Sequence, residues 1–194
     1  MNTVSHKSPP PRMTVEEFFA WDGGGHVGKL ELIDGVVRAM APASATHAII
    51  QGNLVAAIHN HLRGHGSPCR VAPEAPIRPA IGNRSSNTRA PDVAVTCAPP
   101  SASKTFVDPV LIIEVLSPGN VDETWESIRA LAPLPTLTEI VVVESETVGI
   151  EIYRKDARGA WSETPEVHTD GAFRLASIGL DLAVAEVYRG THLV

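Results

Sequence analysis

One charged residue inside an apolar run limits what this chain can fold into more than any other feature. Glu114 lies in VLIIEVLS, which is otherwise the pattern of a central strand. A lone carboxylate there costs free energy unless a partner or a metal ion compensates it. Because side chains alternate along a strand, Glu114 shares one face with Ile112 and Leu116. Two interpretations are open, a buried ion pair with Arg89 or Arg129 and a functional site.

A second carboxylate, Asp92, opens another Val-rich strand. It follows a proline in RAPDVAVTC, and this places it at the end of a strand, where the ligands of open sheets collect. Its separation from Glu114 suits two neighbouring strands joined by a loop, so both carboxylates can converge on one divalent cation. An isolated Pro-Asp pair is more often a turn or a cap, and this alternative stays open for Asp92 alone.

The remaining patterns predict an α/β or α+β architecture, with a central mixed sheet flanked by helices. Apolar residues recur every four positions in 47–62 and predict an amphipathic helix, and the polar segment 122–132 predicts another. Thr14 and Glu17 form a capping box before a short helix, and Asp34-Gly35 suits a tight hairpin. The C-terminal segment toward Tyr188 is amphipathic. Runs rich in Val and Ile predict strands within 69–78, 91–97, 110–117, 139–145, 149–155 and 160–167.

Length and composition limit the domain organisation and the class of protein. We expect residues 1–12, with three consecutive prolines, to form a flexible tail and residues 13–194 to form a single domain. No apolar run is long enough to span a membrane and the N-terminus lacks a secretory signal, so we expect a cytoplasmic protein. Cys69 and Cys97 are too few for a disulfide framework and are expected to be buried small hydrophobes.

The charge balance bears on the partners of the chain. With a net charge of −6, the whole molecule lacks the positive field of a general nucleic-acid binder. This does not exclude a nucleic-acid enzyme, because carboxylates that hold a divalent metal make such a site acidic. Lysine is scarce, and the whole chain contains only Lys7, Lys29, Lys104 and Lys155.

These motifs together resemble the Uma-two family of restriction-endonuclease-like proteins. The resemblance rests on Asp92 in APDVAV, Glu114 in LIIEVLSPGN, the strand EIVVVES and the upstream segment KLELIDGVV, and it covers about residues 13–190. The family is similar to the PD-(D/E)XK nuclease superfamily. The resemblance therefore implies a mixed sheet flanked by helices, an acidic metal site on two adjacent strands, and a metal-dependent endonuclease that acts on nucleic acid, with DNA favoured.

The resemblance also implies a role for particular residues. Asp92 and Glu114 would be carboxylate ligands of Mg²⁺ or Mn²⁺, and the backbone carbonyl of Val115 would complete the shell. Such an ion neutralises charge on the phosphate and lowers the pKa of bound water. Glu31 in LELIDG would be an auxiliary acid near the metal, although as a bare sequence feature a residue on a hairpin strand is expected to face solvent.

His47 heads the helix predicted over 47–62, on the same face as Ile50 and Leu54. An inward histidine is usually a satisfied core residue. The resemblance instead implies that His47 and Gln51 border the carboxylates, where His47 would contact phosphate or orient water.

The chain departs from the superfamily pattern at the catalytic lysine. That lysine normally stands two residues after the glutamate, where this chain has Leu116. In many Uma-two members a lysine on the following helix replaces it, where this chain has Ser127. Arg129 is close in sequence but faces another side of the helix. Two hypotheses stay open, a nuclease that works without the usual lysine and a catalytically degenerate protein that acts as a binding or assembly module.

Basic residues around Asp92 suggest how nucleic acid would be held. Several arginines lie before and around Asp92 in the sequence. They could contact phosphates beside the site, but the simpler interpretation is that they are solvated charges on loops. Many DNA-cutting enzymes work as dimers on duplex DNA, so a homodimer is an expectation by analogy. The arginines are Arg63, Arg70, Arg78, Arg84 and Arg89.

Overall fold

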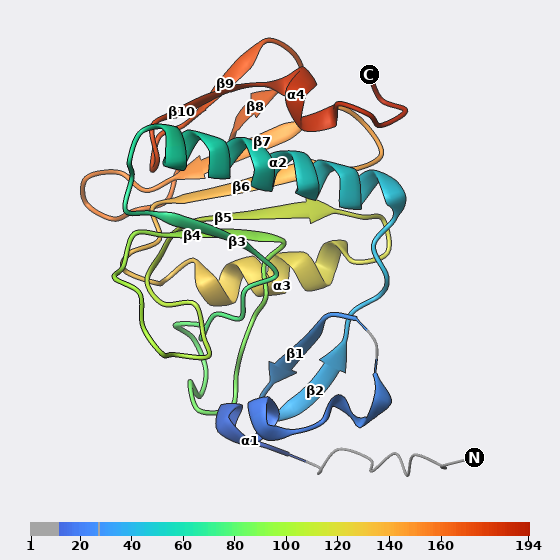
Figure 1. The fold of residues 1–194 in the computed structure, drawn as a ribbon, viewed down its shortest axis with the longest axis vertical. Coiled ribbons are helices and arrows are strands. Elements are labelled where there is room, and N and C mark those ends of the chain that lie inside the picture. The colour runs from blue at the N-terminus through green and yellow to red at the C-terminus, as the bar shows by residue number, and fades with distance from the viewer. Residues whose placement is uncertain (1–11, 27) are drawn as a thin grey trace.

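A six-stranded mixed sheet forms the centre of the computed structural model, which describes residues 12–26 and 28–194 (Figure 1). The expected tail over 1–12 therefore lies almost wholly outside the described residues. The strands lie in the order in which they follow along the chain, and within this sheet only the two central neighbours run parallel. They are β3 (Arg70–Pro73), β4 (Val93–Thr96), β5 (Pro109–Leu116), β6 (Glu139–Glu144), β7 (Ile150–Arg154) and β8 (Glu166–His168). The parallel pair is β5 and β6.

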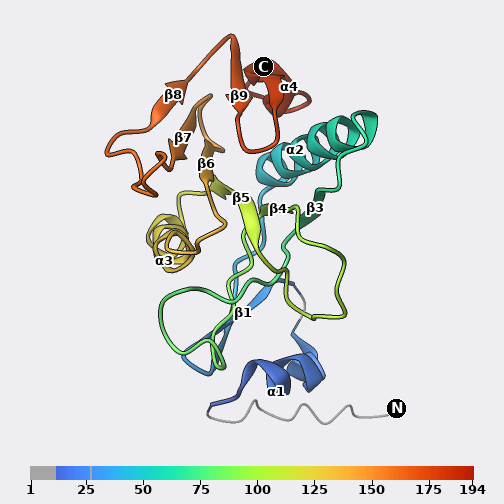
Figure 2. The same ribbon diagram turned by 90° about the vertical axis from the view of Figure 1, so that its left-hand side faces the viewer.

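Two helices cover opposite faces of this sheet, α2 (Ala45–Gly64) and α3 (Val121–Leu131), as Figure 2 shows. The apolar stripe of α2 is buried and packs on one face of β5. The other face of β5 packs against α3. The first cluster contains Ile50, Leu54, Ile58 and Leu62 of α2 and Leu111, Ile113 and Val115 of β5. The second contains Ile112 and Leu116 of β5 and Ile128 and Leu131 of α3. Both predicted helices and the alternation along β5 are confirmed.

An N-terminal hairpin stands at one end of the molecule, below the sheet in Figure 1. It consists of β1 (Leu30–Ile33) and β2 (Val36–Ala39), joined by Asp34 and Gly35, which both have positive φ angles, as predicted for a tight turn. The short helix α1 (Val15–Ala20) precedes it and carries the predicted capping box, and a single 3-10 turn η1 (Gly23–Gly25) follows this helix.

The hairpin is fixed to the segment that leads into β4. The N–H of Thr88 donates to the carbonyl of Leu32 at 2.8 Å, and the hydroxyl of Thr88 accepts from the N–H of Leu32 at 3.3 Å. Leu32 is fully buried. Strand β1 therefore lies beside residues 88–90, immediately before Asp92.

The C-terminal segment forms a second hairpin and a short helix. These are β9 (Ala172–Leu175), β10 (Leu180–Ala183) and α4 (Val184–Tyr188). Phe173, Leu175 and Tyr188 belong to the same core cluster as the stripe of α2. The amphipathic pattern was a correct indication of burial, but it did not distinguish strand from helix over these short elements.

The structure corrects the prediction for the cysteines. Cys69 and Cys97 are joined by a disulfide and are only partly buried. Arg70 pairs with Thr96 in the β3–β4 ladder, so each cysteine stands one position beyond this pair, at the same end of the two strands. Two cysteines are too few for a framework, but antiparallel pairing brings this pair together.

Two further findings concern segment lengths and membranes. The strand expected within 160–167 is displaced, because β8 covers only Glu166–His168. In the part of the chain that the structure describes, no helix has the length and apolar character needed to cross a membrane.

Candidate active site

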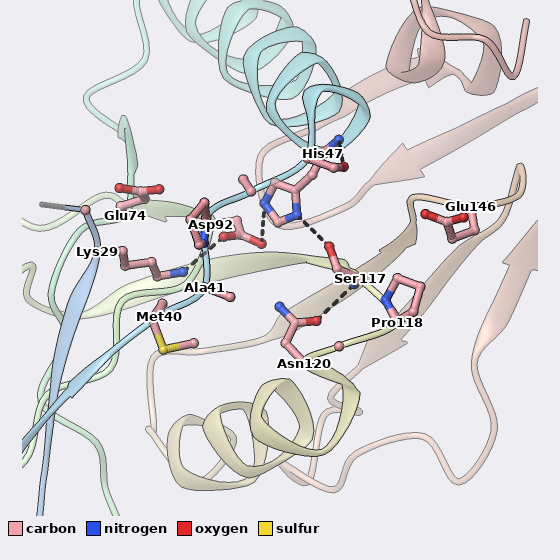
Figure 3. Close-up of a pocket in the computed structure, with 15 residues that line it drawn as sticks. Lys29, Met40, Ala41, His47, Glu74, Asp92, Ser117, Pro118, Asn120 and Glu146 are labelled. Atoms are coloured by element: carbon pink, nitrogen blue, oxygen red, sulfur yellow. Dashed lines mark hydrogen bonds and ion pairs between the residues drawn. The ribbon is translucent and has the colours of Figure 1, made fainter.

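A cavity of about 530 Å³ opens beside Asp92, between the N-terminus of α2 and the loop that follows β5. Its walls include the backbone segments 40–44 and 117–120. Figure 3 shows the side chains of Lys29, His47 and Asp92 meeting at one side of this cavity. Lys29 is the one lysine or arginine among the described residues that line it.

The pairing of β4 with β5 places the two carboxylates side by side. Val93 opens β4 opposite Ile113, so the ladder between these strands ends there and Asp92 lies beside the unpaired edge of β5. The backbone N–H of Val115 donates to Asp92 Oδ2 at 2.8 Å, and the backbone N–H of Asp92 donates to Glu114 Oε2 at 3.3 Å. Both carboxylates are 5% exposed. Two buried acids from adjacent strands are thus tied together through backbone groups.

Burial and charge act differently on the two acids. Burial, followed by the charge of Asp92, raises the pKa of Glu114 well above its usual range. Burial also opposes ionisation of Asp92, but a hydrogen bond from His47 and the positive charge of Lys29 outweigh it and lower the pKa of Asp92. Asp92 is therefore the ionised member of the pair, and Glu114 is the member that a cation would ionise.

Two basic side chains contact Asp92 from other elements. Lys29 Nζ lies 3.0 Å from Asp92 Oδ1, and His47 Nε2 lies 3.3 Å from Asp92 Oδ2. The other ring nitrogen of His47, Nδ1, lies 3.3 Å from the hydroxyl of Ser117. Ser44 caps α2 and accepts from the backbone N–H of His47, which fixes the start of this helix. The imidazole is therefore held between the carboxylate and the loop after β5.

Polar groups behind the pair complete the cluster. Glu31 is 4% exposed, and its Oε1 accepts from the backbone N–H of Ala90 at 2.8 Å. Its charge reaches both Glu114 and Lys29 and raises the pKa of each. The bare-sequence expectation that Glu31 faces solvent is wrong, because β1 lies against residues 88–90 and not at a free surface.

Gln51 and Ser127 also contact the acids. Gln51 Nε2 donates to the carbonyl of Asp92 at 2.8 Å, and Ser127 Oγ donates to Glu114 Oε1 at 3.3 Å. Gln51 therefore borders the carboxylates, as the resemblance implies.

The ion-pair interpretation of Glu114 receives no support from the described residues. Arg89 is buried but donates to the carbonyls of Leu32 and Thr88, and Arg129 is exposed on α3. Glu114 has no arginine or lysine within salt-bridge distance among these residues.

With this geometry established, comparison with known proteins identifies the family. The family model Uma2, described as "Putative restriction endonuclease", matches residues 15–185. This chain belongs to the Uma2 family. The match confirms the resemblance drawn from Asp92, Glu114 and their surrounding motifs.

This chain is also similar to one curated protein in sequence and to one solved structure in fold. The Uncharacterized protein slr1290 of Synechocystis sp. is 34% identical over 191 residues, which are 96% of either chain. A crystal structure from Anabaena variabilis, described as a putative nuclease belonging to DUF820, superimposes with a TM-score of 0.64. The matched region includes 91% of this chain and 97% of the Anabaena chain. At 16% identity this second likeness is one of fold, and it confirms the predicted mixed sheet flanked by helices.

Sequence reasoning missed Lys29 and Ser117 as members of this candidate site. A signal for Lys29 was available, because it stands two positions before Glu31 and side chains at that spacing share one face of a strand. The backbone N–H of Met40 donates to the carbonyl of Lys29, so the ladder of the hairpin extends to this residue. Ser117 carried no comparable signal, since it lies in a loop.

The arginines noted around Asp92 do not line the cavity. Arg78 pairs with Glu16, Arg70 donates to the carbonyl of Ala98, and Arg84 donates to the carbonyl of Pro79. With Arg89 buried beside Leu32, the interpretation as phosphate contacts at the cavity wall is not supported by their positions.

Proposed function

We propose that this Uma2 chain is a metal-dependent endonuclease that hydrolyses phosphodiester bonds of nucleic acid, with DNA as its substrate. The observation that carries this proposal is the meeting of Asp92 and Glu114 at the edge between β4 and β5, beside a cavity. The Uma2 family is described as a putative restriction endonuclease and the Anabaena structure as a putative nuclease, and both descriptions support the reaction class.

The residues present fit a divalent ion that prefers oxygen ligands. Asp92 and Glu114 would supply carboxylates. The N–H of Val115 points to Asp92, so its carbonyl lies on the same side of β5 and would supply a backbone oxygen. Within the described residues no three acidic, histidine or cysteine side chains gather as a metal cluster. Mg²⁺ suits Asp92 and Glu114, because it is usually held by one or two carboxylates together with waters and substrate phosphates, and Mn²⁺ accepts the same oxygen ligands.

When bound, the ion would supply neutralisation of the phosphate charge and a more acidic water. Side chains of the protein would position the phosphate and the water. His47, held between Asp92 and Ser117, presents a ring that can contact a phosphate oxygen or orient a water at the cavity wall. Glu31, fixed by the N–H of Ala90, is an auxiliary acid that adds negative charge behind the ligands and so favours a cation.

Cleavage of supercoiled plasmid and of single-stranded DNA tests the proposal. Purified wild type is incubated with Mg²⁺, Mn²⁺ or EDTA and compared with Glu114→Gln and with Glu123→Gln. Glu123 is exposed on α3 outside the cavity, so it controls for the same chemical change. We expect metal-dependent cleavage by wild type and the control, and a loss of about 100-fold or more in Glu114→Gln, which is a typical cost of removing a charged group at a reaction site.

One observation favours a second candidate, a degenerate binding module. Asp92 and Glu114 each have protein partners on both oxygens, including Ser127 at the position of the helix lysine. If wild type binds Mn²⁺ but cuts neither DNA substrate, the endonuclease proposal is overturned and this second function replaces it.

A further inference from the structure

Lys29, directly before the N-terminal hairpin, brings a positive charge to the site. The family pattern would place this charge on another element. The two positions where that pattern carries a lysine are otherwise occupied in this chain. Leu116 is buried in the apolar cluster against α3, and Ser127 donates to Glu114. Neither can bring positive charge to the reacting phosphate.

Lys29 reaches the same carboxylates from another element. It precedes β1, its side chain is 16% exposed, and its Nζ lies 3.0 Å from Asp92 Oδ1, although the two residues are 63 positions apart. Its ammonium group lies among the charges of Glu114, Asp92 and Glu31. A partly buried ammonium group therefore stands at the acidic pair.

Lys29 has donors to spare beside the cavity. An ammonium group carries several N–H donors, and within the described residues only Asp92 accepts from Lys29. Lys29 lines the cavity, and none of the arginines in the described part of the chain lines it. A phosphate entering here would meet free donors on one lysine.

We propose that Lys29 is a catalytic residue that supplies the cation missing from Leu116 and Ser127, by contacting the scissile phosphate. This inference rests on the proposed function. In the hydrolysis, a water oxygen bonds to phosphorus and the ester bond to the leaving oxygen breaks. One water proton ends on the leaving oxygen, and the other is released as the new phosphate ionises. Lys29 keeps its proton and stabilises the phosphate oxygens and the developing charge through hydrogen bonds.

The test compares wild type with Lys29→Met, Lys29→Arg and Lys104→Met. Lys104 is an exposed loop lysine outside the cavity, so its removal controls for the loss of one positive charge. We expect the plasmid-cleavage rate of Lys29→Met to fall by about 100-fold or more. Lys29→Arg should retain part of the activity, since a guanidinium keeps the charge but not the geometry. Lys104→Met should cleave like wild type.

A second readout does not depend on cleavage. Affinity for a short DNA duplex is measured in Ca²⁺ over a range of salt concentrations, on samples that gels show to be uncut. Loss of a direct phosphate contact should weaken binding in Lys29→Met and reduce the slope of log K against log salt by about 1. Mn²⁺ affinity, measured by calorimetry, should not fall in this variant, because the carboxylates remain.

The outcomes separate this inference from the proposed function. If wild type and Lys29→Met cleave equally, or if Lys29→Met cuts faster and binds Mn²⁺ more tightly, Lys29 is not the catalytic cation and the endonuclease proposal stands. A salt slope in Lys29→Met equal to that of wild type also overturns the contact with phosphate. If wild type cuts nothing, the proposed function fails and the role of Lys29 fails with it. Should Lys29→Met not fold, Lys29→Arg decides. A reduced cleavage rate with a wild-type salt slope supports the inference, and a wild-type rate overturns it.

Discussion

At the scale of single residues, the proposed role of Glu114 in binding a cation implies a loss of stability in the metal-free fold. Its carboxylate is buried, and it lies beside a second acid that is ionised. Natural proteins often lose stability at a functional site in this way. If Glu114 had only a structural role, a neutral side chain of the same shape would make the fold more stable.

We predict that Glu114→Gln melts at a higher temperature than wild type at pH 8 in EDTA. Burial and Asp92 raise the pKa of Glu114 above its ordinary value of 4.5. The native state therefore holds the proton more tightly, and the stability from protonated Glu114 is present below that value and is lost as pH rises through the raised one. Glutamine stays neutral, so the difference should shrink toward pH 4.

Differential scanning calorimetry measures this, and each kcal/mol of stability corresponds to about 2–4 °C at this chain length. Adding Mn²⁺ should raise the melting temperature of wild type but not of Glu114→Gln. A variant less stable than wild type at pH 8 without metal would contradict this account of Glu114.

Local sequence patterns mark the two acids of the site, but they do not predict the contact of Lys29 with Asp92. Glu114 interrupts an apolar strand and Asp92 opens another, so local patterns mark both. The spacing of Lys29 and Glu31 indicates a shared strand face, but Lys29 reaches Asp92 only because the hairpin lies along residues 88–90, and the local sequence does not predict that packing.

At the scale of elements, the β1–β2 hairpin and the residue before it place Glu31 and Lys29 at the candidate site, so the turn of the hairpin bears on the geometry of that site. Gly35 has a φ of 81°, and a Cβ added there would lie 3.1 Å from the carbonyl oxygen of Met13. Left-handed backbone and a close approach both favour glycine at this position.

We predict that Gly35→Ala lowers the free energy of unfolding by about 1–3 kcal/mol, the usual cost of placing a non-glycine residue in the left-handed region. Gly64→Ala is the matched control, because Gly64 ends α2 and a Cβ there meets nothing within 4 Å. The control should be neutral or stabilise by about 0.4–1 kcal/mol. Urea unfolding of both variants provides the measurement, and equal stabilities would show that the turn tolerates a side chain.

Periodicity predicted the longer elements because each buries one continuous face. The stripe of α2 and the alternation of β5 are examples. It did not predict the Cys69–Cys97 disulfide, which depends on the pairing of β3 with β4 and not on either local sequence. It also failed over β9, β10 and α4, which are too short to show a clear period.

At the scale of the whole molecule, the protein itself supplies little positive charge to attract nucleic acid. A net charge of −6 gives no long-range attraction for a polyanion. The cavity adds only Lys29 and His47 as basic side chains among the described residues. A divalent ion at the acidic pair would therefore supply much of the positive charge that holds a phosphate there.

The central claim is that Asp92 and Glu114 hold this ion, and a crystal of wild type soaked in Mn²⁺ tests it most directly. Anomalous scattering locates the metal independently of activity. We predict a peak in contact with both carboxylates and with the carbonyl of Val115, and Lys29 Nζ still within the cavity. No peak at these residues, under Mn²⁺ concentrations that saturate the protein by calorimetry, would contradict the claim.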